Sequence, residues 1–440
     1  MIFCAVLLFP LFIFLALVFA FIKIREEFSF AAKVIKFFKE ALKSVGSLIL
    51  IFVIGYLVVY ALYFVFTINY PIQKQASDTE YILTSFANGP DQNWEACKLN
   101  SKVSMARRIR CLADVDIWMA KNKVFRPLGE YMFGVLMVLQ RSSGGNTAYF
   151  LGEVSSGGWW YYFPAVFILK EPLPSLILIT LAILIVLFSL IKNFRSSSLK
   201  ERFFNYLELN FAEFSMLSFV VLYWAYSIKS PLNIGVRHIL PTLPLIYILS
   251  TEAVKNWVRQ KIDLTEGFLK KLFIFSVNIV KTSLKTALII VLIIWYLLEA
   301  FLNAPYFISY FNELGGGTAN GYEHVTDSNY DWGQDLKRLA QFADNHKIDK
   351  IAVNYFGGGD IYYYLGKNRA NDWNSSKGNP KFEGINWLAI SINNLQGAIG
   401  KLRSGQTRNP EDEYQWLQKI KNPYKPDYRA GTSIFIYKLN

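Results

Sequence analysis

The chain has 440 residues, of which 53% are hydrophobic, 17% aromatic and only 18% charged, and its formal net charge is +13. Soluble domains carry about 25% charged and 45–50% apolar residues, so this composition excludes a disordered chain and argues against a purely soluble one. The apolar residues are collected in uninterrupted runs, which is typical of a membrane protein. The excess positive charge lies in the first 304 residues, where it indicates topology and lipid head groups rather than nucleic-acid binding.

Six stretches have the length and apolar character of a membrane-spanning helix, which needs about 20 mostly apolar residues. They lie at residues 2–22, 46–68, 173–191, 211–228, 236–252 and 285–304. The fifth contains prolines, which spanning helices tolerate because neighbouring groups satisfy the freed backbone atoms. The sequence therefore predicts a polytopic α-helical membrane domain over residues 1–304, with about six transmembrane helices plus interfacial helices.

Three connecting segments, residues 23–45, 192–208 and 253–285, are rich in lysine and arginine. Cytoplasmic loops carry this excess, so alternation places the loop 70–172 and the tail 305–440 outside, with the protein multi-pass in the cell membrane. The first span starts at residue 2 without a preceding charge or a cleavage site for a signal peptide. Either the N-terminus lies outside, or further spans precede this sequence.

The outer loop 70–172 contains one predicted helix at 112–122 and two apolar segments, 128–140 and 158–169, that are too short to span. Such segments are typical of interfacial helices at the head-group level. Cys97 and Cys111 also lie in this loop. In the oxidising setting outside a cell they form either a disulfide or two free thiols.

The second short segment contains Trp159, Trp160, Tyr161 and Tyr162 in succession. One interpretation is an aromatic belt, because Trp and Tyr favour the membrane–water boundary. The functional interpretation is a cleft that grips a sugar or a lipid head group.

Lys170, Arg237 and His238 lie at the predicted outer ends of apolar segments. Ionisable groups at such depth are costly and are functional candidates. Arg237 is suited to a bidentate phosphate contact, and Lys170 can hold a phosphate as a point charge. The alternative is that the cations are anchors reaching for the head groups and that His238 is a hydrogen-bonded structural residue.

The tail 305–440 reads as an α/β domain, with predicted strands at 350–355, 386–392 and 432–438 and helices at 332–346, 360–366 and 411–421. The turn at Gly357–Gly359 does not match a dinucleotide or P-loop motif. Residues 327–338 resemble the start of an EF-hand loop but have Trp332 and Arg338 where Gly and Glu are required. We therefore expect no metal site and no cofactor.

Several segments in this order resemble a known family: Tyr149–Glu153 (YFLGE), Gly158–Pro164 (GWWYYFP), Leu169–Pro174 (LKEPLP), Asn233–Pro241 (NIGVRHILP), Tyr310–Gly316 (YFNELGG) and Asp327–Arg338 (DSNYDWGQDLKR). Together they resemble the latter part of bacterial membrane glycosyltransferases of family 39, the protein mannosyltransferase-like group. The resemblance runs from about residue 120 to the end of the chain.

The resemblance implies a GT-C enzyme that takes a sugar from a polyprenyl-phosphate carrier at the outer membrane face and transfers it with inversion. Its implied partners are this lipid-linked sugar donor and membrane lipids. The cations would hold the phosphate and the aromatic residues would wall the groove, so the predicted substrate-binding residues are Lys170, Arg237, His238, Trp159, Tyr161, Tyr162 and Glu153. Glu153 and Glu171 are carboxylates of the outer face, but neither is assigned as the catalytic base.

In this family the base is an Asp in the first outer loop, and here no acidic loop follows an initial span on the outer side. With the small number of spans, this predicts that an N-terminal portion is missing, or is supplied by a partner polypeptide if the enzyme is split. The catalytic residues therefore stay unknown. The alternatives are a non-catalytic membrane subunit that binds a polyprenyl-phosphate lipid and a lipid-linked sugar transporter, although no internal repeat of the kind found in transporters is visible.

Overall fold

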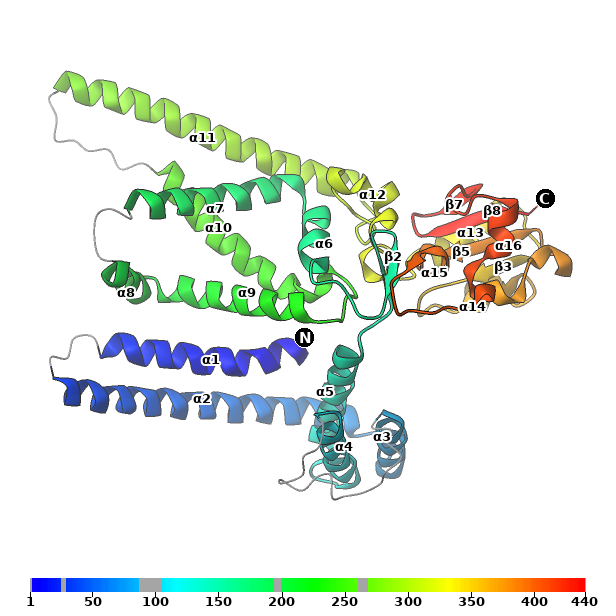
Figure 1. The fold of residues 1–440 in the computed structure, drawn as a ribbon, viewed down its shortest axis with the longest axis horizontal. Helices are drawn as coiled ribbons and strands as arrows, with labels where there is room; N and C mark the ends of the chain where they lie inside the picture. Colours follow the sequence, from blue (N-terminus) through cyan, green and yellow to red (C-terminus); the bar gives the residue numbers. More distant parts are fainter. Residues whose placement is uncertain (1, 25–28, 87–104, 194–198, 260–267, 440) are drawn as a thin grey trace. The chain divides into compact units, whose positions relative to one another are not determined.

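The computed structural model describes residues 2–24, 29–86, 105–193, 199–259 and 268–439. They fall into two compact units, one made of residues 1–144 and 198–223 and the other of residues 145–197 and 224–440. Figure 1 shows long helices in both units and a small sheet region near the C-terminus. The division passes through helix α9 (Phe211–Lys229), so it does not coincide with the predicted boundary at 304/305. That boundary concerns the membrane and stays a prediction.

The first unit is entirely helical among its described residues. It contains α1 (Ile2–Lys23), α2 (Phe30–Thr67), α3 (Ile72–Phe86), α4 (Met105–Lys121), α5 (Arg126–Gly144), α8 (Leu199–Leu209) and the first part of α9. The rings of Phe9 and Phe52 stack where α1 meets α2, with centroids 3.6 Å apart. Helices α3, α4 and α5 pack around buried Leu83, Ala113 and Leu136. The predicted helix 112–122 and interfacial segment 128–140 are thus α4 and α5.

The helical part of the second unit contains α6 (Tyr162–Lys170), α7 (Leu173–Asn193), α10 (Leu243–Val258) and α11 (Phe268–Leu302). Short 3₁₀ turns, η2 (Val236–His238) and η3 (Leu240–Thr242), precede α10. The predicted interfacial segment 158–169 corresponds to α6 and to the turn before it.

Four described helices are long and apolar enough to cross a membrane: Phe30–Thr67, Leu173–Lys192, Phe211–Lys229 and Ile274–Leu302. The mostly helical architecture is therefore confirmed, while a count of six spans stays a prediction. In α1 the apolar stretch Leu8–Lys23 is shorter than this length. The segment 236–252 is not one helix, because α10 begins only at Leu243 and has 16 residues. Its prolines lie in the first positions of η3 and α10, where the missing N–H costs no helical hydrogen bond.

Two of the long helices extend beyond their apolar stretches. α2 begins at Phe30 rather than at residue 46, and α11 begins at Phe268 rather than at residue 285. Lysine, glutamate and leucine are good helix formers, so the basic segments continue the helices instead of forming loops. A search by hydropathy finds only the apolar part of such a helix.

The tail contains a five-stranded sheet with the strand order β4-β3-β5-β8-β7. The strands are β3 (Ile351–Asn354), β4 (Ala370–Asp372), β5 (Trp387–Ser391), β7 (Tyr428–Ala430) and β8 (Ile434–Lys438). β3 pairs in parallel with β4 and β5, whereas β8 runs antiparallel to β5 and β7. The three predicted strands correspond to β3, β5 and β8. The mixed pairing covers both edges of the central strand β5.

Helices α13 (Leu336–Asn345), α14 (Ile361–Leu365), α15 (Ile392–Ile399) and α16 (Gln415–Ile420) accompany this sheet, as does the short α12 (Gly317–Asn320). The first, second and fourth match the predicted helices. On α13 the apolar residues recur at helical spacing, and Leu339 and Ala343 are buried against Ile351 and Ile436 of the sheet. This contact forms the core of the tail.

A second sheet joins distant parts of the chain. β1 (Ala148–Phe150) and β2 (Glu153–Ser155) form a hairpin, and β6 (Lys401–Leu402) pairs in parallel with β2. The Leu151 N–H also donates to the carbonyl of His324 at 2.7 Å. The segment that leads into α6 is therefore bonded to the tail. Cys97 and the side chain of Cys111 lie outside the described residues, so their pairing stays a prediction.

Truncation of Leu339 to alanine is expected to destabilise the tail by about 2–5 kcal/mol, because this side chain is fully buried and its loss leaves a cavity. Lys337 on the same helix is exposed, so Lys337→Ala is the matched control. Hydrogen exchange measured on β3 and β5 reports the change. Equal exchange in both variants would contradict the assigned core.

Candidate functional site

The turn before α6 is held by Asn233. The Asn233 side-chain oxygen accepts a hydrogen bond from the Trp159 N–H at 2.6 Å. Gly158 has a φ of +68°, and a Cβ at this position would lie 2.8 Å from that same oxygen. The turn therefore requires glycine both for its left-handed backbone and for the close approach. This explains why the GWW motif and the start of the NIGVRH motif occur in one protein.

Asn329 joins three segments at the base of α6. Its side-chain amide donates to the Tyr162 hydroxyl at 2.8 Å, and its side-chain oxygen accepts from the Val236 N–H at 2.9 Å. Its backbone carbonyl accepts a hydrogen bond from Lys170. Asn329 is fully buried, so each of these polar groups has a partner where water is excluded. Within the DSNYDWG motif, Asn329 thus connects these three segments by hydrogen bonds.

Lys170 is the last residue of α6, and its ammonium group faces the tail. It donates to the carbonyls of Ile308, at 2.8 Å, and Asn329. It also lies 4.8 Å from the centre of the Phe311 ring. Burial lowers the pKa of Lys170 to about 7, since desolvation disfavours the charged form. An ammonium has three N–H groups, so one remains for an anion.

Arg237 is exposed on η2 and lies over an aromatic ring of the same tail segment. Its guanidinium carbon is 4.3 Å from the centre of the Trp332 ring, and Trp332 is 48% exposed. The stacking orients the guanidinium while leaving its N–H groups for another partner. The structure thus brings Lys170 and Arg237 to one segment, residues 329–332, through different contacts.

The remaining predicted site residues divide by exposure. Trp159 and Tyr162 are buried, and the Trp159 indole donates to Glu153 at 3.4 Å. Tyr161 is 37% exposed and its neighbour Trp160 is 71% exposed. Trp159, Tyr162 and Glu153 therefore support the turn, and Trp160 and Tyr161 are the rings that a ligand can reach. His238 is half-buried, edge-on to Phe163 at 6.4 Å.

Asn312 closes the other end of α6. Its side-chain amide donates to the carbonyls of Ile168, at 2.6 Å, and Glu171, at 2.8 Å, which end the helix. Its side-chain oxygen accepts from the N–H groups of Leu314 and Gly315. The amide satisfies carbonyls that a helix end otherwise leaves open. Through Asn312, the YFNELGG motif caps the C-terminal end of α6.

Two buried acids organise the tail side of the site. Asp335 accepts the N–H groups of Thr432 and Ser433, each at 2.9 Å, and also pairs with Arg338. Asp331 accepts the N–H groups of Gly333 and Asn393 at 3.1 and 3.3 Å. Burial raises the pKa of Asp331 to about 7. Both carboxylates are therefore held by backbone N–H groups of the tail.

Sequence reasoning singled out the charged and aromatic residues of the motifs and missed their amides. Asn233, Asn312 and Asn329 carry most of the contacts described above. Each lies inside a motif that the resemblance quoted, so the signal was present. A neutral amide gives no signal of burial or charge by itself, and only its contacts show its role.

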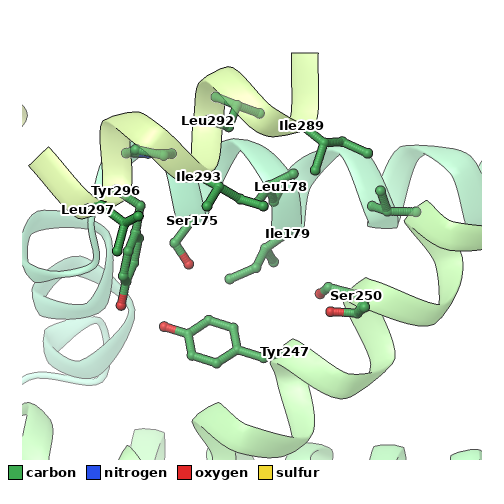
Figure 2. Close-up of a pocket in the computed structure, with 13 residues that line it drawn as sticks. Ser175, Leu178, Ile179, Tyr247, Ser250, Ile289, Leu292, Ile293, Tyr296 and Leu297 are labelled. Carbon is green, nitrogen blue, oxygen red and sulfur yellow. The ribbon is translucent and has the colours of Figure 1, made fainter. Parts of the chain in front are cut away.

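A cavity of about 390 Å³ lies between helices α7, α10 and α11. Its walls are mostly aliphatic, with Leu178 and Ile179 from α7 and Ile289, Leu292 and Ile293 from α11, as Figure 2 shows. The polar groups that line it include Ser175, Tyr247, Ser250 and Tyr296.

The polar wall of this cavity connects to the end of α6. The Tyr247 hydroxyl donates to the carboxylate of Glu171, and Glu171 is buried. Glu171 directly follows Lys170 in the chain. Tyr247 in the cavity wall is thus hydrogen-bonded to Glu171, the residue next to the partly buried Lys170.

No protein-family model, no curated protein and no solved structure matches this chain. What the site can do therefore has to be read from its residues and their contacts. These contacts offer an apolar cavity between long helices, two cations held against one tail segment, and two exposed aromatic rings.

Replacement of Asn329 by alanine is expected to lower the free energy of unfolding by about 2–4 kcal/mol, because it leaves buried hydrogen-bonding groups without partners. Hydrogen exchange should rise in residues 158–171 and 233–242 while β5 stays protected. Asn345 is exposed at the end of α13, so Asn345→Ala is the control. Unchanged exchange around α6 in the Asn329 variant would refute the joining role.

Proposed function

We propose that this chain forms the donor-binding part of a membrane glycosyltransferase. The enzyme takes a sugar from a polyprenyl-phosphate carrier at the outer face of the cell membrane and transfers it to an acceptor. The observation that carries the proposal is the apolar cavity between α7, α10 and α11, whose Tyr247 is bonded to the residue next to Lys170. A long hydrocarbon with a phosphate at its end matches an apolar cavity that is followed by a cation.

The cavity suits an isoprenoid chain because its walls are aliphatic side chains of helices that already face an apolar environment. Binding there exchanges contacts with lipid tails for contacts with these side chains, so it depends on close packing rather than on removal from water. The volume of about 390 Å³ falls in the usual range for ligand sites, roughly 300–1,000 Å³. It holds the part of the carrier nearest the phosphate, and the rest of the carrier stays in the lipid.

The cations suit the phosphate for two different reasons. Lys170 has a lowered pKa because it is desolvated, and an anion beside it restores the charged form. Arg237 presents a planar guanidinium whose face lies on Trp332, which leaves the N–H edge for two phosphate oxygens. Fixed cations favour the transition state, since charge develops on the phosphate as the bond from the sugar to the phosphate oxygen breaks.

Transfer also requires a base that removes the proton from the attacking hydroxyl of the acceptor. The carboxylate of Glu171 accepts from Tyr247, and that of Asp331 accepts two backbone N–H groups. Both are engaged by the fold, so we assign the base to neither. The family resemblance implies that the base is an Asp in the first outer loop after an initial span, and no residue that the structure describes is assigned to that role.

A bulky side chain in the cavity is expected to block the carrier. Ile179→Trp should reduce photo-crosslinking of the chain by a benzophenone-labelled polyprenyl phosphate at least about fivefold, because the indole fills the space that the hydrocarbon needs. Ile177 lies on the same helix, is 42% exposed and does not line the cavity.

Ile177→Trp is therefore the matched control and should leave crosslinking unchanged. Equal labelling of both variants would count against the cavity as the carrier site. Mapping the labelled peptides to α7, α10 or α11 provides a second, independent measurement.

Binding of the phosphate is expected to weaken as the pH rises through 7. The phosphodiester keeps its charge over this range, while Lys170 loses its proton near pH 7. Between about pH 7 and 10.4 Lys170 is protonated in the unfolded chain but largely neutral in the folded one. The free energy of unfolding therefore increases as the pH rises through this range. A loss of affinity of about tenfold between pH 6.5 and 8.5 therefore cannot come from unfolding.

Lys170→Arg should abolish this pH dependence, because arginine stays charged. Arg237→Ala should lower the affinity at every pH without flattening the profile. Equilibrium binding of a polyprenyl-phosphate sugar to the detergent-solubilised chain measures all three proteins. A flat profile for the unmodified chain would exclude Lys170 from the phosphate site.

A further inference from the structure

A second cavity, of about 450 Å³, lies in the tail and has a different chemistry. It is formed by the β1–β2 hairpin, the end of β3, the start of α15 and the segments around residues 375 and 410. Four asparagines line it, Asn354, Asn374, Asn393 and Asn394, together with Arg408 and Asp412. None of these residues belongs to the cavity between the helices or to the contacts of Lys170 and Arg237.

Part of this polar cleft is held rigid by its own hydrogen bonds. The Asn394 amide donates to the Asn354 side-chain oxygen, and the Asn354 amide donates to the Tyr414 hydroxyl, both at 2.7 Å. The Asn393 side-chain oxygen accepts from the Asp327 N–H at 2.9 Å. Tyr414 is buried. The side chains are therefore positioned before a ligand arrives, which lowers the entropic cost of binding.

Other polar atoms of the same side chains are not used by the fold. The amide nitrogens of Asn374 and Asn393, the side-chain oxygen of Asn394 and the carboxylate of Asp412 have no hydrogen-bond partner in the part of the chain that the structure describes. The cleft thus offers both donors and acceptors. A hydroxyl group is both a donor and an acceptor, so a ligand rich in hydroxyls satisfies both kinds.

The two charged side chains that line the cleft, Arg408 and Asp412, have opposite signs, so the lining does not favour a strongly anionic ligand. Arg408 donates to the carbonyls of Gly397 and Gly400 and lies 3.4 Å from Glu413. Its two terminal nitrogens are therefore engaged by the protein, while its Nε has no hydrogen-bond partner in the described part of the chain. Of the adjacent acids Glu411, Asp412 and Glu413, Asp412 lines the cleft.

We infer that the polar cleft binds a neutral saccharide through its asparagine amides and Asp412. The inference goes beyond the proposed transferase and stands without it, since it depends only on the tail and on the β1–β2 hairpin bonded to it. In the context of the transferase, the cleft gives the outer domain a site for a sugar-bearing molecule that is separate from the carrier site.

The test uses the full chain in detergent micelles and a panel of neutral sugars: glucose, galactose, mannose, N-acetylglucosamine and disaccharides of each. Saturation-transfer-difference NMR should show binding of at least one of them. Asp412→Ala and Asn394→Ala should each weaken it about tenfold, since each removes a hydrogen bond to the ligand. Asp349 is exposed outside the cleft, and Asp349→Ala should bind as the unmodified chain does.

The side chain of Asp412 makes no described contact, so Asp412→Ala should unfold at an unchanged temperature, and its effect then reports on binding. The inference fails if no saccharide binds, if both cleft variants bind as the control does, or if a sugar phosphate or a peptide binds more tightly than every neutral sugar. Crosslinking of the polyprenyl phosphate should be the same in all three variants. The two proposals can therefore fail separately.

Discussion

A buried amide group without a hydrogen bond lowers the free energy of unfolding, so a folded chain can have few of them. In the second unit this constraint determines how the segments around α6 pack. α6 is a nine-residue helix between the hairpin β1–β2 and the long helix α7. Asn233 is hydrogen-bonded to the turn before the helix, and Asn312 to carbonyls at its end. Asn329 is hydrogen-bonded to the first residue, Tyr162, and to the last, Lys170. Each asparagine comes from a different segment. The three together fix where Lys170 can lie.

The position of Lys170 has an electrostatic consequence. A lysine that donates to two carbonyls beside an aromatic ring is desolvated, and its pKa falls to about 7. The group is then poised to gain a proton when an anion arrives. Arg237 keeps its charge and is exposed, with Trp332 supporting its face. The same scaffold therefore supplies one responsive cation and one permanent cation.

The two cavities of the second unit differ in the ligands that they can accept. The one between the helices is walled by leucine and isoleucine and has its polar groups at few positions. The polar cleft is lined by four asparagines together with Arg408 and Asp412. A hydrocarbon gains nothing in the second, and a hydroxyl-rich molecule loses hydrogen bonds in the first.

Some features of this protein can be determined from the sequence alone, because they depend on local pattern. Long apolar runs predict helices such as α7 and α9. Short continuous apolar runs predict β3, β5 and β8 with errors of one or two residues. The motifs also pointed to the segments that meet around α6. Hydropathy failed at the basic ends of α2 and α11, because charged residues with good helix propensity continue each helix beyond its apolar stretch.

Other features were decided only by the tertiary structure. The pairing of β2 with β6 joins residues about 250 positions apart, and no local pattern encodes such a partner. Trp159 and Tyr162 belong to the same aromatic run as Trp160 and Tyr161, yet the first two are buried and the others exposed. Neither cavity is visible in the sequence, because its walls come from separate elements. Composition and periodicity thus determine which elements form, whereas burial and hydrogen-bond partners, which decide what a site can bind, exist only once distant segments have packed.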